Sequence, residues 1–241
     1  MDKNPESKNM PGGLNLPAKE LPHVKHSKDD WRNSAHWRVF RIMAEFVDGF
    51  QFLADFKKTV TFFGSARFKE DNRWYKEAQA LGGMLSKEGY AIVTGGGPGI
   101  MEAGNRGALE GRGDSVGLNI QLPHEQRVNP FVKKAIGFHY FFTRKVMLSY
   151  SAQAYVYFPG GFGTLDEAFE LLTLIQTHKI DPMPVILVGR GFWGHVDKLM
   201  REQLIEEHQT IDPDDLDLYT IVDTAREAFD IIEKSKPRGD L

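Results

Sequence analysis

Short apolar runs alternate with helical stretches along the chain from residue 59 to residue 234, and glycine-rich turns follow several of the runs. The runs expected as strands are Thr59–Phe63, Tyr90–Thr94, Ser115–Ile120, Ala154–Phe158, Val185–Val188 and Tyr219–Val222. The stretches expected as helices are 71–88, 99–110, 143–152, 164–178, 193–208 and 223–234. Apolar strands separated by helices indicate a parallel sheet covered on both faces. The pattern therefore predicts an α/β fold with a Rossmann-like, doubly wound parallel sheet.

An N-terminal helix is expected ahead of this alternation. From Trp37 to Phe56 apolar residues recur at intervals of three and four, as on an amphipathic helix. This stretch is rich in large aromatic side chains, so we expect part of its surface, with helix 143–152, to lie at an interface between two copies. Residues 1–29 are polar and rich in Lys, Asn, Pro and Gly, which predicts a flexible tail. We expect residues 30–241 to form a single domain.

Composition excludes several classes of protein. Lys and Arg total 30 against 33 Asp and Glu, and the net charge of −3 gives no electrostatic footprint for nucleic acid or an anionic membrane. The absence of Cys removes disulfides, thiol nucleophiles and Cys-ligated zinc. No uncharged apolar run approaches the roughly 18 residues of a membrane span, and the first residues do not resemble a signal peptide, so a cytoplasmic location is expected. His23 and His26 lie in the tail, and we expect no metal site.

Two glycine-rich loops follow the first two predicted strands. Ligands of doubly wound sheets bind beyond the carboxyl ends of the strands, where these loops lie. The first loop offers small residues, a hydroxyl and a guanidinium that suit a phosphate. The second, Gly95–Gly99, leaves backbone N–H groups uncovered at a helix N-terminus, which favours an anion, although a tight turn for helix packing is the alternative. Ile100 breaks the dinucleotide fingerprint, and the Lys-Ser/Thr pair of a P-loop is missing. The candidate binding residues here are Gly64, Ser65, Arg67, Gly96, Gly97 and Gly99.

A third loop, Pro159–Glu167, joins another strand to a helix that we expect Thr164 to open. Thr164 and Glu167 fit a capping box, so Glu167 is either a helix cap, a catalytic carboxylate or both. Between the loops, Arg144 and Lys145 stand in the first turn expected for helix 143–152. Each cation opposes the helix dipole by about 0.3–1 kcal/mol, which a bound anion would offset; two solvated surface cations are the alternative.

These elements resemble the LONELY GUY family, the cytokinin-activating nucleotide phosphoribohydrolases formerly labelled lysine decarboxylase-like. The family signature PGGxGTxxE is matched by Pro159–Glu167, the Arg-Lys element by Arg144 and Lys145, and the triple glycine by Gly95–Gly97. The N-terminal extension and the segment Pro98–Glu102 look like the larger bacterial members. The resemblance implies a nucleotide-binding domain that works without a cofactor and assembles as a homodimer or higher oligomer.

The resemblance also implies a reaction. The family cleaves the N-glycosidic bond of a nucleoside 5′-monophosphate, here AMP or an N6-substituted AMP, to give free base and ribose 5-phosphate. Positive charge builds on the ribose as the bond breaks, so a nearby carboxylate should stabilise the transition state. Arg144 and Glu167 are carried over as catalytic. The residues carried over as phosphate- or nucleotide-binding, beside those of the first two loops, are Lys145, Gly160, Gly161, Gly163 and Thr164.

Two rival functions are considered. A pyridoxal decarboxylase needs a Schiff-base lysine with a phosphate cup and a pyridinium partner, and Lys145 beside Arg144 gives no such constellation. A non-catalytic nucleotide or cofactor carrier on the same fold is the stronger rival, since fold does not settle function. The joint presence of Arg144 and Glu167 favours the hydrolase, because a carrier would not require both. The expected partners are therefore a nucleoside monophosphate and a second copy of the chain, with no nucleic acid and no membrane.

Overall fold

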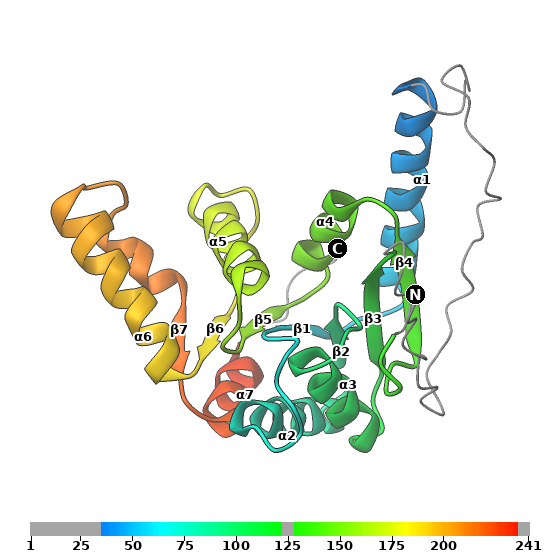
Figure 1. The fold of residues 1–241 in the computed structure, drawn as a ribbon, viewed down its shortest axis with the longest axis horizontal. Coiled ribbons are helices and arrows are strands. Elements are labelled where there is room, and N and C mark those ends of the chain that lie inside the picture. The colour runs from blue at the N-terminus through cyan, green and yellow to red at the C-terminus, as the bar shows by residue number, and fades with distance from the viewer. Residues whose placement is uncertain (1–34, 122–127, 236–241) are drawn as a thin grey trace, which may run out of the picture.

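The computed structural model describes residues 35–121 and 128–235, and the predicted tail over 1–29 lies outside them. Within these ranges seven parallel strands form one sheet in the order β4-β3-β2-β1-β5-β6-β7 (Figure 1). The strands are β1 (Thr59–Phe63), β2 (Ala91–Thr94), β3 (Ser115–Ile120), β4 (Lys134–Phe138), β5 (Ala154–Tyr157), β6 (Val185–Val188) and β7 (Thr220–Val222).

Helices cover both faces of this sheet. The helices are α1 (Ala35–Leu53), α2 (Arg73–Lys87), α3 (Ile100–Glu110), α4 (Phe141–Tyr150), α5 (Phe162–Gln176), α6 (Arg190–Leu199) and α7 (Ala225–Lys234). A π-helix, Met200–Glu207, continues α6, and a 3₁₀ helix spans Pro213–Leu218. Helices α2, α3 and α7 lie on one face, and α1, α4, α5 and α6 on the other (Figure 1). The predicted doubly wound α/β fold is confirmed.

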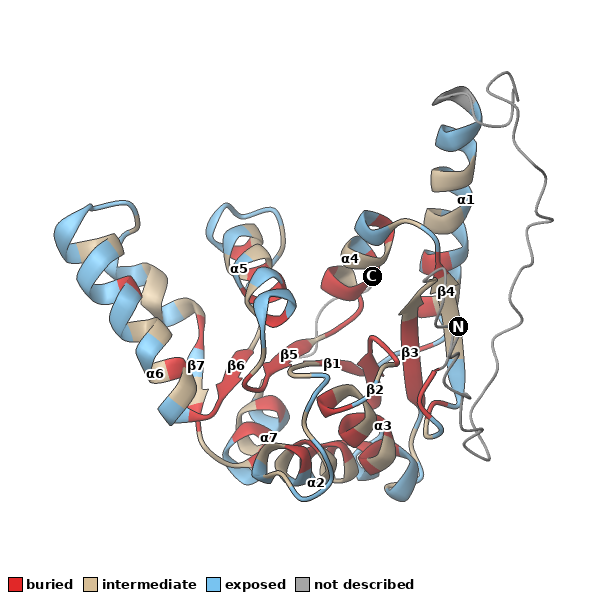
Figure 2. Ribbon diagram, viewed as in Figure 1, coloured by how far each residue is buried: buried red, intermediate tan, exposed pale blue. Residues whose placement is uncertain are grey.

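The central strands are buried along their whole length, which explains why the sequence reads as continuous apolar runs (Figure 2). On one face Val60 and Phe62 pack with α2, α3 and α7. On the other face Tyr155 and Tyr157 pack with α5 and α6, while Val93 and Leu118 pack with α1 and α4. Burial of each large apolar side chain contributes about 1.5–3 kcal/mol, so the sheet is a rigid platform for the loops at its edge.

Strand β4 is missing from the sequence prediction. Its residues, Lys134–Phe138, include an exposed lysine and a glycine, and only Phe138 is buried. The strand lies at the edge of the sheet and pairs with β3 alone. An edge strand does not need to be apolar on both faces, so the pattern that reveals the central strands does not find it.

The chain reverses its direction of winding between β1 and β5. It moves from β1 outward to β4, then returns through α4 to β5, which pairs with the opposite side of β1. A crevice at such a switch point, beyond the carboxyl ends of the strands, is where open α/β sheets bind ligands. The loops after β1, β2 and β5 and the crossover helix α4 all meet at this edge.

Candidate active site

The three glycine-rich loops are tied together by backbone hydrogen bonds through Ser65. Its N–H donates to Pro159 O (3.0 Å), and its carbonyl oxygen accepts from Ile100 N (3.0 Å). Gly99 has φ +72°, and a Cβ atom there would collide with the backbone of Ser65 and Ala66. A glycine is therefore required where the second loop crosses the first.

Hydrogen bonds of two buried asparagines hold the second loop in place. Asn129 donates from its backbone N–H to Gly96 O (2.8 Å) and from Nδ2 to Gly97 O (3.0 Å). The same Nδ2 lies 2.9 Å from Asn105 Oδ1, which also accepts from Thr94 Oγ1 (2.7 Å). Neither asparagine stands out in the sequence, because a lone amide carries no motif and only the fold brings residues 105 and 129 together.

The backbone N–H groups of the second loop differ in whether they already have an acceptor. The N–H of Gly96 donates to Thr94 Oγ1 (2.9 Å), so it is already used inside the loop. The N–H groups of Gly97 and Gly99 donate to no acceptor within the described ranges. In the first loop Ser65 Oγ accepts from Arg67 N (3.1 Å), and the Arg67 side chain is exposed. Gly97 and Gly99 are thus better placed than Gly96 to donate to an anion.

Helix α4 begins at Phe141, two residues before the predicted start, and brings Arg144 to the end of its first turn. Arg144 Nε donates to Leu118 O in β3 (2.9 Å). A Cβ atom built on Gly95 would collide with Arg144 Nη2, so the guanidinium lies directly against the second loop. Burial lowers the pKa of Arg144, and the charge of Glu167 opposes this shift.

Lys145 faces the carboxylates of α5. Its Nζ lies 2.5 Å from Asp166 Oδ2, 3.0 Å from Glu170 Oε2 and 3.9 Å from Glu167 Oε1, and its side chain is only 15% exposed. Burial alone would lower the pKa of Lys145, but hydrogen bonds to Asp166 and Glu170 raise it above its usual value. The sequence predicts that a bound anion offsets the positive charge of Lys145. In the structure the carboxylates of Asp166 and Glu170 offset that charge. Contact between Lys145 and a phosphate stays a prediction.

Glu167 is not a helix cap. Helix α5 begins at Phe162 with Gly161 at its N-cap position, so Thr164 is the third helical residue and Glu167 lies in the second turn. The predicted capping box is therefore wrong, because the glycine loop starts the helix earlier than Thr164. Thr164 instead packs against Gly160, where a Cβ atom would collide with Thr164 Oγ1.

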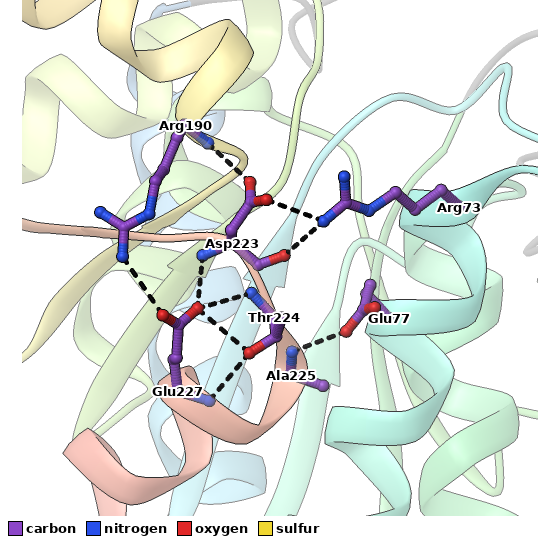
Figure 3. A network of polar contacts seen from close by, with 7 residues as sticks. All are labelled: Arg73, Glu77, Arg190, Asp223, Thr224, Ala225 and Glu227. Carbon is purple, nitrogen blue, oxygen red and sulfur yellow. Dashed lines mark hydrogen bonds and ion pairs between the residues drawn. The ribbon is translucent and has the colours of Figure 1, made fainter.

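The same Thr-x-x-Glu pattern occurs at α7, and there the box forms. Thr224 is the N-cap: its Oγ1 accepts from Glu227 N (3.2 Å), and Glu227 Oε2 accepts from Thr224 N (3.0 Å), as Figure 3 shows. Backbone hydrogen bonding to Asp223, with further bonds to Thr224 and Arg190, holds the pKa of Glu227 below its usual value. One pattern thus gives a cap at α7 and a buried, uncapped carboxylate at α5.

The environment of Glu167 raises its pKa from the usual 4.5 to about 7. Burial is the main cause, since the residue is 6% exposed; the charges of Lys145 and Arg144 lower the pKa, and those of Glu170 and Asp166 raise it. Oε2 of Glu167 is buried and has no hydrogen-bond partner among the residues described. A carboxyl group with this pKa exchanges a proton near neutral pH, which suits a general base.

The structure thus collects most of the predicted residues at one edge. Glu167, Gly95 and Gly96 are buried there, and Arg144 and Gly97 are half-buried. Gly161 and Gly163 are exposed at the start of α5, whose first N–H groups point out of the helix. An open amide surface beside a half-buried guanidinium and a buried carboxylate can bind an anion and carry out acid–base chemistry on the group attached to it.

Comparison with known proteins places the chain in a family. A family model described as "Possible lysine decarboxylase" matches residues 101–232, a little over half of the chain. The chain belongs to this family. It is the LONELY GUY family that the sequence motifs indicate, and the matched range contains Arg144, Lys145 and the whole third loop.

Curated LONELY GUY relatives carry the name of an activity. A protein of Oryza sativa subsp. japonica named probable cytokinin riboside 5′-monophosphate phosphoribohydrolase is 32% identical over 149 residues, 60% of this chain and 58% of that protein. A cytokinin riboside 5′-monophosphate phosphoribohydrolase of Mycobacterium marinum is 30% identical over 124 residues, 51% of this chain and 65% of that protein. The chain thus spans less than two thirds of either relative.

A solved structure supports the fold. The molybdenum cofactor carrier protein of Chlamydomonas reinhardtii aligns with a TM-score of 0.54 at 21% identity, covering 74% of this chain and 97% of that one. At this identity the likeness concerns the fold alone. Proteins on the LONELY GUY fold therefore differ in what they bind.

The decarboxylase description does not fit the lysine at this site. A Schiff base needs a lysine whose amine can be deprotonated, whereas Lys145 is paired with Asp166 and Glu170, which raise its pKa.

The parts of the chain that the structure describes hold no cluster of three metal-ligating side chains. No helix within them is long and apolar enough to cross a membrane.

Proposed function

We propose that the chain is a cytoplasmic phosphoribohydrolase that cleaves the N-glycosidic bond of a nucleoside 5′-monophosphate. The products are the free base and ribose 5-phosphate. Its LONELY GUY membership and the names of its curated relatives support the reaction class. The observation that carries the proposal is Glu167, a buried carboxyl group that is not used as a cap and whose pKa lies at about 7.

Backbone amides bind the 5′-phosphate in this proposal. The N–H groups of Gly97 and Gly99 and those of the first turn of α5 supply the donors, and both helix N-termini favour a negative charge. Arg67, exposed on the first loop at the same edge, supplies a further positive charge. A phosphate held there places the ribose between the second and third loops, beside Glu167 and Arg144.

Glu167 and Arg144 act on the bond itself. The bond between C1′ and the base nitrogen breaks with its electron pair going to the base, which leaves positive charge on the ribose. The Glu167 carboxylate stabilises that charge and takes a proton from the water whose oxygen bonds to C1′. Arg144 donates hydrogen bonds to the departing base or to the phosphate. The base takes up a proton from solvent, and Glu167 releases to solvent the proton that it took from the water. Water thus adds as hydroxyl to the sugar and as hydrogen to the base.

AMP or an N6-substituted AMP is the proposed substrate, and the protein acts as a homodimer. The proposed interface is the apolar face of α1 and α4, where Phe40 and Val47 are 61% and 62% exposed, and Phe141 and Phe142 are 53% and 49% exposed. Exposed apolar side chains gathered on two adjacent helices are typical of a surface that a partner covers.

The test is a panel of purine and pyrimidine nucleoside monophosphates incubated with the purified chain. Chromatography should show a free purine base, and an equal amount of ribose 5-phosphate should appear. The matching nucleosides, which lack the phosphate, should react poorly. Tight binding of a nucleotide without release of base from any member of the panel would contradict the proposal and favour a carrier.

A further inference from the structure

Glu45, in the middle of α1, bonds to the segment that leads into helix α4 of the candidate site. Its Oε1 accepts a hydrogen bond from His139 N (2.8 Å). Its Oε2 accepts from Tyr140 N (3.2 Å) and from Thr143 Oγ1 (2.6 Å). Both carboxylate oxygens are thus bound to the segment that starts α4.

Helix α4 has no cap of its own. Tyr140 occupies the N-cap position without a side-chain hydrogen bond, and the first turn contains no acidic residue. The first N–H groups of a helix lack partners within the helix, and a negative charge is favoured beside them. Glu45 brings a negative charge to this N-terminus, although it precedes His139 by 94 positions. Its oxygens accept from the two residues before the helix, His139 and Tyr140, and from the Thr143 hydroxyl.

Close packing sets the distance between α1 and α4. Gly49 lies one turn after Glu45, and a Cβ atom there would come within 2.6 Å of Met147 Sδ on α4. Nearby, the Phe50 and Tyr150 rings meet edge to face with centroids 5.1 Å apart. The glycine lets the two helices approach, and this approach brings the Glu45 carboxylate to the start of α4.

The residue that Glu45 holds directly precedes Arg144. Thr143 is fully buried, and its Oγ1 lies 2.8 Å from Tyr140 O as well as 2.6 Å from Glu45. Arg144 N donates to the same Tyr140 carbonyl (3.3 Å), which closes the first turn. The Arg144 side chain then runs to Leu118 O and Gly95, so a small rotation of this turn would move the guanidinium out of place.

We propose that Glu45 is a positioning residue, which fixes the first turn of α4 and thereby the direction in which Arg144 points into the site. The catalytic consequence rests on the proposed function, whereas the placement of Arg144 does not. Glu45 lies before residue 101, where the match to the family model begins. The N-terminal helix therefore takes part in assembling the site.

The kinetic test compares Glu45→Gln with Asp48→Asn, which neutralises an exposed carboxylate on the same helix. Glutamine replaces one carboxylate oxygen by an N–H₂ group, which cannot accept the hydrogen bonds that His139, Tyr140 and Thr143 donate. On the substrate identified in the nucleotide panel, Glu45→Gln should lower kcat by about tenfold to a hundredfold with KM within about threefold, because misplacing a catalytic group affects mainly the chemical step. Asp48→Asn should retain wild-type kinetics. Glu45→Asp, which keeps the carboxylate, should recover part of the loss.

A second readout does not depend on activity. The Arg144 Nε–H is half-buried and bonded to the carbonyl of the fully buried Leu118, so its NMR signal, assigned by its loss in Arg144→Lys, should exchange with solvent more slowly than that of an exposed arginine. Exchange should accelerate in Glu45→Gln and, less strongly, in Glu45→Asp, which serves if the glutamine variant does not fold. Slow exchange together with unchanged kcat in a folded Glu45 variant would overturn the proposal. If no nucleotide releases base, the proposed function fails, while the exchange rate still decides the role of Glu45.

Discussion

Gly95 and Arg144 touch at the carboxyl edge of the sheet. A Cβ atom built on Gly95 would collide with Arg144 Nη2 and would lie 2.9 Å from Met101 Sδ. The positive backbone φ angles of this loop belong to Gly96 and Gly99, so torsion does not explain the glycine at position 95. The guanidinium of Arg144 occupies the space that any other residue type would fill.

Gly95→Ala should therefore displace Arg144 and lower turnover by about tenfold to a hundredfold. The melting temperature should fall little, because Arg144 can swing toward solvent. The matched control is Gly194→Ala in α6, where an added methyl group meets no atom within 4 Å. That variant should keep wild-type turnover. Steady-state kinetics of the two purified variants check the prediction, and equal turnover in both would contradict it.

Turnover should depend on pH through Glu167. Its pKa of about 7 means that the carboxylate fraction grows as the pH rises toward neutrality. If the carboxylate is the active form, kcat/KM, which reports the free enzyme, should rise about tenfold per pH unit below about 6 and level off above about 8. The matching profile of Glu167→Gln shows the part that ionisation of the free nucleotide contributes. Profiles of the same shape for both proteins between about pH 5.5 and 8 would exclude this role.

The free energy of unfolding should change with pH in the opposite direction to turnover. The folded-state pKa of Glu167 is raised, so between its usual 4.5 and about 7 the folded protein binds more protons than the unfolded chain. The contribution of Glu167 to the free energy of unfolding therefore falls as pH rises through this window. Glu167→Gln should stabilise the protein at pH 8 by up to about 3 kcal/mol and change little at pH 4.5. Urea unfolding at the two pH values checks this, and destabilisation at pH 8 would contradict it.

The apolar face of α1 and α4 predicts self-association. Light scattering at micromolar concentration should give at least twice the chain mass. Replacing Phe40 and Val47, which are 61% and 62% exposed, by aspartate should shift the mass toward the monomer without unfolding the chain. Replacing the exposed Leu109 on α3, on the opposite face of the sheet, should leave the mass unchanged. A monomeric wild-type protein would remove this interface.

The sequence was most informative where burial was greatest. Strands such as Ala91–Thr94 and Val185–Val188 are buried on both faces, so their apolar runs identify them and their order along the chain predicts the parallel sheet. The edge strand Lys134–Phe138 is exposed along part of its length and does not show this pattern. Local composition therefore predicted the centre of the sheet and missed its edge.

In the candidate site, too, some features could be predicted from the sequence and others could not. Glycine loops and the Arg-Lys pair are visible in the sequence because each is a local motif. Where the helix after the third loop begins is decided by Gly161, and this start determines that Glu167 is not a cap. The contacts of Glu45 and Asn129 join segments far apart along the chain, and no local pattern announces them.

The central claim is that Glu167 acts in catalysis and does not cap a helix, and paired substitutions at the two Thr-x-x-Glu sequences test it most directly. Glu167→Gln and Glu227→Gln remove one carboxylate each, at an uncapped position of α5 and in the capping box of α7. Release of adenine from AMP, followed by chromatography, should fall about a hundredfold or more in Glu167→Gln, with AMP affinity retained, since about 3 kcal/mol of transition-state stabilisation is lost. Glu227→Gln should release adenine at the wild-type rate. Wild-type release by Glu167→Gln would contradict the claim.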